Sequence, residues 1–535
     1  TDEEFRAFLK ERKIRPEEVD PTSRGDFAAI RYAPPDNPMQ SPGMHLYTTL
    51  FRHAYGLRMM RERTEIVRKF LPHALIGANF SPHHGPLYLG SVHQWVHSFR
   101  QGVLTLPWDE DYAWSVPIGS PQASSIAIDL LRSAIRKQPN APIQHYVMAH
   151  APGTNPRAWR RQFYAAVAHG VRIFNLFDLV PLAGAPTENY VNDPAMFQAV
   201  RNALHELGSF EDLLQEAHRH PTAAALWFSE IGDVWNDHDP PFGAELRSLY
   251  LGLSHQHLPL DIVVEEDAFD KTIDVYRQIF LVDRHVSQRA ARALARWVER
   301  GGTLVVSAGA GFRDELDRPA KVLEKLVGAE ELKLEVDTSL ALEKQDLPWA
   351  PVLGRVLLKN QAVDIVGARW HLRHNKDTSV ELRFEDGEPA LLRRRVGKGE
   401  VIALAFLPGL SYLRPALPLR PVDRGSREDT LAHLLPTGVS PAIASLLESL
   451  SSGLERAAVT SSPLIEAALL EGPSGWLVPV IDWTGAEATE VQVTVPTGPF
   501  RRVSLASGHP VHMEERGGKQ VASFRVETAD ALLLR

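Results

Sequence analysis

The stretch that decides the fold is APIQHYVMAHAPGTNPRAWRRQFYAAVAHGVRIFNLFDLV, residues 141–180. Residues 143–148 are apolar and rich in strand-forming side chains, and residues 159–168 have helical spacing that Gly170 ends. Residues 171–177 form a second apolar run. Two buried strands joined by one helix predict a parallel crossover unit, and such units build the eight-stranded barrels of many large enzymes.

The residues that follow these two strands are the first candidates for chemistry, because barrel enzymes place their sites at the carboxyl ends of the strands. Ala149 and His150 follow the first strand, and Asp178 follows the second. We therefore expect His150 to contact a ligand and Asp178 to serve as a candidate catalytic carboxylate.

Two earlier segments are predicted to form further barrel strands. Residues 74–80 contain Asn79 near their end, and residues 103–106 precede the sequence PWDEDYAW. Aromatic faces stack on sugar rings, and carboxylates and amides hydrogen-bond vicinal hydroxyls. The expected sugar-binding residues here are Asn79, Trp108, Tyr112 and Trp114, and the expected acids are Asp109 and Glu110. The alternative is a structured loop with solvated acids, whose tryptophans cap the barrel.

Composition excludes several classes of protein. The chain has 535 residues, 44% of them hydrophobic and 23% charged, with a net charge of −8 and no basic tract. These values predict a soluble multidomain protein without a nucleic-acid partner or a membrane span, and they leave the compartment unknown. The absence of cysteine excludes disulfides and thiolate chemistry. Histidines that are close in sequence lack a metal-binding motif, so no metal and no cofactor are expected.

Three domains are expected. A full barrel takes ~250 residues, but residues 1–220 supply only about four strands, so we predict the C-terminal portion of a TIM-type (β/α)8 barrel. Strands alternate with helices in residues 221–430, which predicts a doubly wound parallel α/β sheet. Short alternating strands in residues 431–535 predict a β-sandwich.

The run VMAHAPG, the helix that ends in AHG and the strand after it resemble the last two barrel strands of bacterial family-42 beta-galactosidases. The run IFLVDRHVSQRAARALARWVERGGTLVVSAGAG resembles the amidotransferase-like domain that helps to build a trimer in that family. The C-terminal strands resemble its small β domain. The resemblance implies a glycoside hydrolase lineage, a β-linked galactoside-type carbohydrate as ligand, and a homo-oligomer, with a trimer as one option. It also implies that the loop carrying Trp235 faces the barrel mouth, where Trp235 contacts sugar or packs between domains.

In the same family a glutamate at the end of the seventh strand attacks the sugar, and Ala149 falls at that position. The acid/base residue of the family would lie before Thr1, on an upstream barrel half that belongs to the same precursor or to a separate chain. Hydrolysis would then require a substitute carboxylate, with Asp109, Glu110 and Asp178 as candidates. The alternative is a non-catalytic carbohydrate-binding or structural assembly subunit derived from a glycosidase.

Overall fold

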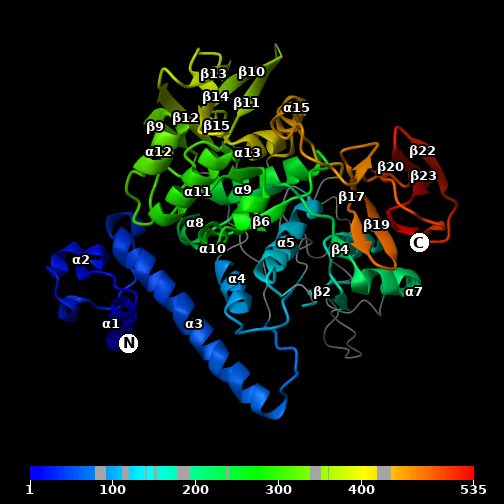
Figure 1. The fold of residues 1–535 in the computed structure, drawn as a ribbon, viewed down its shortest axis with the longest axis horizontal. Helices are drawn as coiled ribbons and strands as arrows, with labels where there is room; N and C mark the ends of the chain where they lie inside the picture. The colour runs from blue at the N-terminus through cyan, green and yellow to red at the C-terminus, as the bar shows by residue number, and fades with distance from the viewer. Residues whose placement is uncertain are drawn as a thin grey trace.

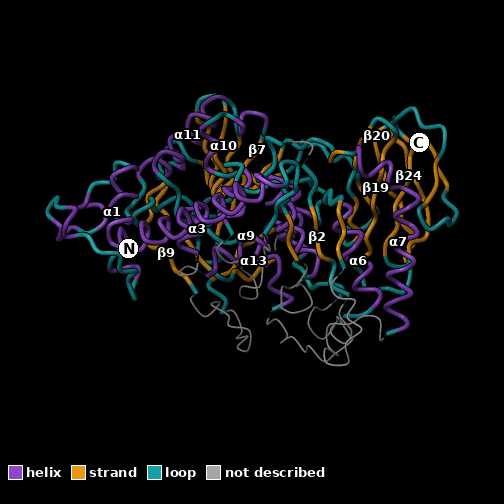
Figure 2. The backbone as a smooth tube through the Cα atoms, turned by 90° about the horizontal axis from the view of Figure 1, so that it is seen from below, coloured by secondary structure: helices purple, strands orange, loops and turns teal. Residues whose placement is uncertain are grey.

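The computed structural model describes residues 1–78, 92–110, 120–138, 141–149, 154–176, 193–236, 240–337, 351–359, 361–417 and 435–535. The N-terminal helices and the C-terminal β domain lie at opposite ends of the molecule, and the largest sheet lies between them (Figures 1 and 2). None of the helices described here combines the length and the apolar character needed to cross a bilayer.

The N-terminal region is helical. It consists of α1 (Asp2–Glu11), α2 (Pro16–Val19), the 3-10 turns η1 (Pro21–Ser23), η2 (Phe27–Ala29) and η3 (Pro38–Gln40), and the long helix α3 (Pro42–Phe70). Thr1 and Glu4 form a capping box that starts α1. The rings of Phe5 and Phe51 lie 5.3 Å apart, so α1 packs on the first half of α3. The C-terminal end of α3, where Phe70 is exposed, extends away from the rest of the protein in Figure 1.

The barrel portion follows. Its elements are α4 (His93–Arg100), β1 (Trp108–Glu110), η5 (Pro121–Ser124), α5 (Ser125–Ala134), β2 (Gln144–Tyr146), α6 (Pro156–Ala168), β3 (Ile173–Asn175) and α7 (Pro194–Glu216). The strands form a parallel sheet in the order β1-β2-β3, with α6 between β2 and β3. The parallel crossover unit predicted from residues 141–180 is therefore confirmed. Asn155 caps α6 by accepting a hydrogen bond from the backbone N–H of Ala158.

The strand predicted at residues 103–106 is wrong, because this segment is irregular and β1 begins only at Trp108. Val103 and Leu104 are buried in the apolar core, which explains the apolar run without a strand. The backbone N–H groups of Thr105 and Leu106 both donate to the carbonyl of Ile76. Residues 74–78 thus lie beside the chain that enters β1, although they form no strand themselves.

The central domain is built on a seven-stranded sheet in the order β13-β14-β15-β8-β7-β5-β6. The strands are β5 (Ala224–Trp227), β6 (Asp261–Val263), β7 (Gln278–Leu281), β8 (Thr303–Val306), β13 (Ser379–Arg383), β14 (Pro389–Val396) and β15 (Gly399–Leu404). The run from β15 to β6 is parallel, and β13 and β14 are antiparallel. The predicted α/β sheet is confirmed, with an antiparallel edge that the sequence reading did not include.

Helices and two smaller sheets accompany this sheet. The helical elements are α8 (Glu230–Asn236), α9 (Pro240–Ser254), α10 (Glu265–Phe269), η7 (Thr272–Val275), α11 (Gln288–Arg300), α12 (Lys321–Val327), α13 (Pro408–Leu413) and η9 (Arg414–Ala416). Strand β9 (Ala329–Val336) pairs with β12 (Ala368–His374), and β10 (Gly354–Leu358) pairs with β11 (Gln361–Ile365).

The C-terminal region begins with α15 (Pro441–Leu450) and continues as two packed antiparallel sheets. The strands are β16 (Val459–Thr460), β17 (Ile465–Ala467), β18 (Leu470–Gly472), β19 (Gly475–Asp482), β20 (Thr489–Pro496), β21 (Val503–Leu505), β22 (His512–Arg516), β23 (Lys519–Val526) and β24 (Ala529–Leu534). One sheet has the order β16-β20-β23-β22, and the other runs β21-β24-β19-β18-β4. Val478 and Leu532 of one sheet share a core with Val493 and Phe524 of the other, as expected for a β-sandwich.

Strand β4 (His218–Arg219) joins the barrel portion to the sandwich. It precedes the predicted domain boundary at residue 220, yet it pairs with β18 in the sandwich sheet. The boundaries at residues 220 and 430 therefore remain predictions.

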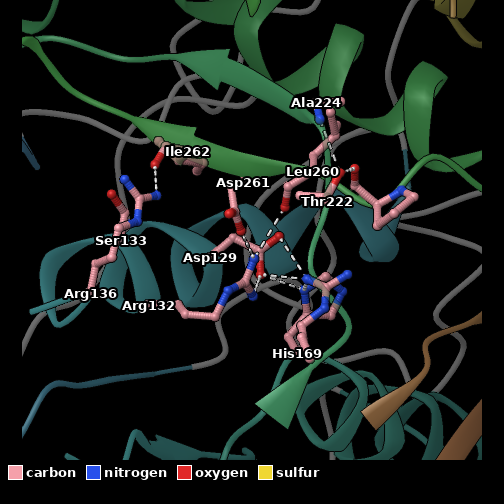
Figure 3. Close-up of polar contacts among 12 residues, drawn as sticks. Asp129, Arg132, Ser133, Arg136, His169, Thr222, Ala224, Leu260, Asp261 and Ile262 are labelled. Carbon is pink, nitrogen blue, oxygen red and sulfur yellow. Dashed lines mark hydrogen bonds and ion pairs between the residues drawn. The ribbon is translucent and has the colours of Figure 1, made fainter. Parts of the chain in front are cut away.

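A buried charge cluster centred on Asp129 of α5 lies at this junction (Figure 3). Its carboxylate accepts hydrogen bonds from Nδ1 of His169 at 2.6 Å and from the hydroxyl of Tyr250 at 2.8 Å. It also pairs with Arg132 and Arg219. Burial alone would raise the pKa of Asp129, but these cationic neighbours outweigh it and hold the pKa well below its usual range.

Candidate functional site

The sheet β1-β2-β3 packs one face on helices, and its other face, called the open face below, carries half-buried side chains. In β1, Asp109 is buried, while Trp108 and Glu110 are half-buried. In β2, His145 is buried between the half-buried Gln144 and Tyr146. Side chains alternate between the two faces of a sheet, so the register places Trp108, Glu110, Gln144 and Tyr146 together on the open face.

The crossover helices cover the opposite face. Phe174 of β3, which lies in register with His145, packs on Phe163 of α6 with ring centroids 4.7 Å apart. Val147 is buried in the same helix-facing cluster. In a closed barrel the helices surround the strands, so the open face is the one that would line the interior.

Asp109 therefore lies on the wrong side of the sheet for catalysis at a barrel mouth. Its Oδ1 atom is 2.6 Å from Nδ1 of His145, and only 1% of Asp109 is exposed. A carboxylate in this position is a buried pairing partner and cannot reach a sugar on the open face. The geometry thus favours a structural role for Asp109, and its catalytic role stays a prediction.

Two aromatic side chains define the surface of the open face. The rings of Trp108 and Tyr146 lie 5.1 Å apart at an angle of 53°. Gly77 lies against the indole, because a Cβ atom at that position would come within 2.4 Å of Cδ1 of Trp108. An aromatic surface with the Glu110 carboxylate beside it can stack on a sugar ring and accept hydrogen bonds from its hydroxyls.

Ala149, at the position assigned to the nucleophile by resemblance, is fully buried. It belongs to the helix-facing core with Val147, Trp159 and Phe163. A buried methyl group can neither attack an anomeric carbon nor contact a ligand. Within β1–β3, all of whose residues the structure describes, Glu110 is the carboxylate on the open face.

Comparisons with known proteins agree with this architecture. The family model described as the beta-galactosidase trimerisation domain of family 42 matches residues 224–417. The chain is therefore family-42 beta-galactosidase-like in fold. No curated protein sequence matches it significantly.

Solved structures of this family match the family-42-like chain along its whole length. A catalytic mutant of the beta-galactosidase Gan42B from G. stearothermophilus has a TM-score of 0.72 and 16% identity, covering 100% of this chain and 75% of that one. The beta-galactosidase from Bacillus circulans sp. alkalophilus has a TM-score of 0.71 and 16% identity, with 100% and 76% covered. The enzyme from Rahnella sp. R3 has a TM-score of 0.69 and 14% identity, with 98% and 75% covered. At these identities the similarity concerns the fold.

Trp235 of the family-42-like chain lies in α8, within the matched domain, and it is fully buried. Its indole stacks on His285 at 4.6 Å and contacts His45 of α3 at 4.8 Å. Its Nε1 atom donates to the carbonyl of Glu315. The indole thus has one ring face stacked, its polar atom hydrogen-bonded and its side chain fully buried, so Trp235 packs between the N-terminal helices and the central domain, the alternative to sugar contact expected from the resemblance.

The remaining predicted site residues are Asn79, Tyr112, Trp114, His150 and Asp178, which lie outside the described residues. Tyr146 was absent from the predicted site residues, and so was Gly77. Placing QHY of β2 in register with WDE of β1 would have shown that Tyr146 lies beside Glu110. In the described part of the chain, no group of three or more His, Asp and Glu side chains is placed to hold a metal ion.

Proposed function

We propose that this family-42-like chain binds a β-linked, galactoside-type carbohydrate on the open face of the β1-β2-β3 sheet. The observation that carries the proposal is the grouping of the half-buried Trp108, Tyr146 and Glu110 on the face opposite the helices, where two rings lie 5.1 Å apart. The structural relatives support the ligand class, because they are beta-galactosidases.

In this proposal the chain binds sugar without hydrolysing it by the retaining mechanism. That mechanism needs two carboxyl groups about 5 Å apart, one as acid and one as nucleophile. Glu110 supplies one carboxylate on this face, Asp109 is turned toward the helices, and Ala149 has no carboxyl group. The chain would act as a carbohydrate-binding subunit of a homo-oligomer assembled through its trimerisation domain.

The second candidate is a hydrolase in which Glu110 acts with a carboxylate from another part of the site. Glu110 favours it, because its carboxylate lies on the same face as the aromatic rings. Asp178 remains the proposed second carboxylate that acts with Glu110. The proposed sugar-binding residues remain Asn79, Tyr112, Trp114 and His150. An upstream barrel segment that carries the acid/base residue also stays part of this candidate.

One pair of measurements separates the two candidates. Calorimetric titration with β-linked galactobiose reports binding, and release of p-nitrophenol from its β-galactoside reports hydrolysis. We expect saturable binding without hydrolysis above the spontaneous rate. Hydrolysis that is lost in Glu110→Gln would support the second candidate, whereas absence of both binding and hydrolysis would refute both.

A further inference from the structure

A small cavity of about 50 Å³ lies where α5, the end of α9, β4 and the sandwich meet. Its polar wall includes Asp129, His169, Arg219, Tyr250, His257 and Glu466. The lining of this cavity includes none of the residues of the carbohydrate site on β1 and β2. Its chemistry depends on which of these polar groups already have partners.

Both carboxylates in the wall of the cavity already accept hydrogen bonds from neighbouring side chains. Asp129 accepts hydrogen bonds from His169 and Tyr250 in addition to its arginine pairs. Glu466 accepts one from Nε2 of His169 at 3.0 Å and one from Nε1 of Trp483 at 2.8 Å. His169 thus uses both ring nitrogens between two carboxylates. These groups hold the three segments together and leave no acid free to attract a cation.

Some N–H groups of the Arg219 guanidinium have no hydrogen-bond acceptor among the described residues. Its hydrogen bonds to side chains of the described residues come from Nη1 alone, which lies 3.2 Å from Oδ1 of Asp129. No described residue accepts a hydrogen bond from its Nε or Nη2 atoms, and the side chain is 16% exposed. A guanidinium group presents a fork of N–H donors that matches an oxyanion.

His257 offers a second donor to the same cavity. Its backbone has φ +55°, a left-handed conformation that few residues other than glycine adopt. Nε2 has one weak contact, 3.5 Å from Oγ1 of Thr460, and no side-chain hydrogen bond to Nδ1 is found in the described part of the chain. Burial, with a contribution from Arg456, lowers the pKa of His257 to about 4, so the ring is a neutral donor at pH 7.

We propose that this cavity binds one small tetrahedral oxyanion, such as inorganic phosphate, through the free N–H groups of Arg219 and the ring of His257. The volume of the cavity agrees with an ion of this size. One water needs about 10–15 Å³ by this measure, and 50 Å³ accommodates an ion of a few heavy atoms. The bound ion would bridge the barrel portion, the central domain and the sandwich.

The test is titration of the full chain with sodium phosphate, followed by calorimetry and by the thermal unfolding midpoint. Sodium sulfate and glucose 6-phosphate are tested in parallel, and sodium chloride at equal ionic strength serves as the reference. We expect one saturable site for phosphate or sulfate and a rise in the midpoint that chloride does not produce. Glucose 6-phosphate that binds more tightly than phosphate would overturn the assignment of the free ion in favour of a phosphate ester.

Two variants locate the ion. Arg219→Lys keeps the positive charge beside Asp129 but loses the fork, and we expect at least tenfold weaker phosphate binding. In His257→Asn the new residue tolerates the left-handed backbone, so the variant should fold. We expect it to bind phosphate several-fold more weakly. It tests the site independently if Arg219→Lys folds poorly. Arg277→Lys, at an exposed arginine outside this cavity, should bind as the wild type does. Wild-type affinity in Arg219→Lys and His257→Asn, or no saturable phosphate binding at all, would contradict the proposal.

Discussion

Nδ1 of His145 lies 2.6 Å from Oδ1 of Asp109, and both side chains are buried on the helix-facing side of the β1-β2-β3 sheet. We predict that Asp109→Ala lowers the free energy of unfolding by roughly 3 kcal/mol, because it removes the carboxylate that pairs with the buried Nδ1 atom of His145. Sugar affinity of the folded variant should not change. Urea unfolding and calorimetry measure the two effects, and wild-type stability combined with lost binding would show that Asp109 belongs to the site.

Gly77 tests the position of the indole. In Gly77→Ala the new Cβ atom would lie 2.4 Å from Cδ1 of Trp108 and 2.8 Å from the carbonyl of Leu106, so the ring or the backbone must move. We expect weaker carbohydrate binding and a changed near-ultraviolet circular dichroism spectrum. Gly56→Ala in α3 is the matched control, since nothing lies within 4 Å of its new Cβ atom. It should stabilise the protein by about 0.5–1 kcal/mol without affecting binding.

Trp235 should behave as a packing residue. Its full burial between His285 and His45 predicts that Trp235→Ala costs about 3–5 kcal/mol of stability. The milder Trp235→Phe variant should remain folded and retain wild-type sugar affinity. Loss of affinity in a folded Trp235→Phe protein would restore the sugar-binding role expected from the resemblance.

His169 makes stability depend on pH. Burial by itself would lower the pKa of His169, but the charge and hydrogen bond of Asp129 and the hydrogen bond of Glu466 outweigh it and raise the pKa above the ordinary 6.5. Because the folded protein holds this proton more tightly, the stabilisation is fully present below pH 6.5 and is lost as the pH rises through the raised pKa.

The corresponding variant is His169→Gln. Its free energy of unfolding should fall below that of the wild type, with the difference largest at acidic pH and smaller toward alkaline pH. His374→Gln, at an exposed histidine, is the control and should reproduce the wild-type pH profile. A difference between His169→Gln and wild type that grows with rising pH would contradict this assignment.

The sequence predicted the parallel crossover, the central α/β sheet and the sandwich because each depends on local periodicity. Residues 288–300 have strong helical spacing, and α11 has those bounds. The predicted strand at residues 464–470 instead divides into β17 and β18, both paired with β19. Pairing between distant segments, such as β4 with β18, leaves no local pattern that could have indicated it.

The candidate site was predictable in its residue types but not in its orientation. The run WDE was identified as a sugar-binding cluster, yet which of Asp109 and Glu110 faces a ligand depends on the register with β2. That register is fixed by the helices that cover one face of the sheet. A one-residue difference along β1 therefore separates a buried pairing partner, Asp109, from a half-buried carboxylate on the opposite face, Glu110.

The most direct test of the account is calorimetric titration of Trp108→Ala with β-linked galactobiose, in parallel with the wild type and with Trp235→Phe. Removing one stacking ring should cost about 1.4 kcal/mol, a tenfold loss of affinity, while Trp235→Phe binds as the wild type does. Equal affinity in wild type and Trp108→Ala would contradict a carbohydrate site on the open face of the β1-β2-β3 sheet.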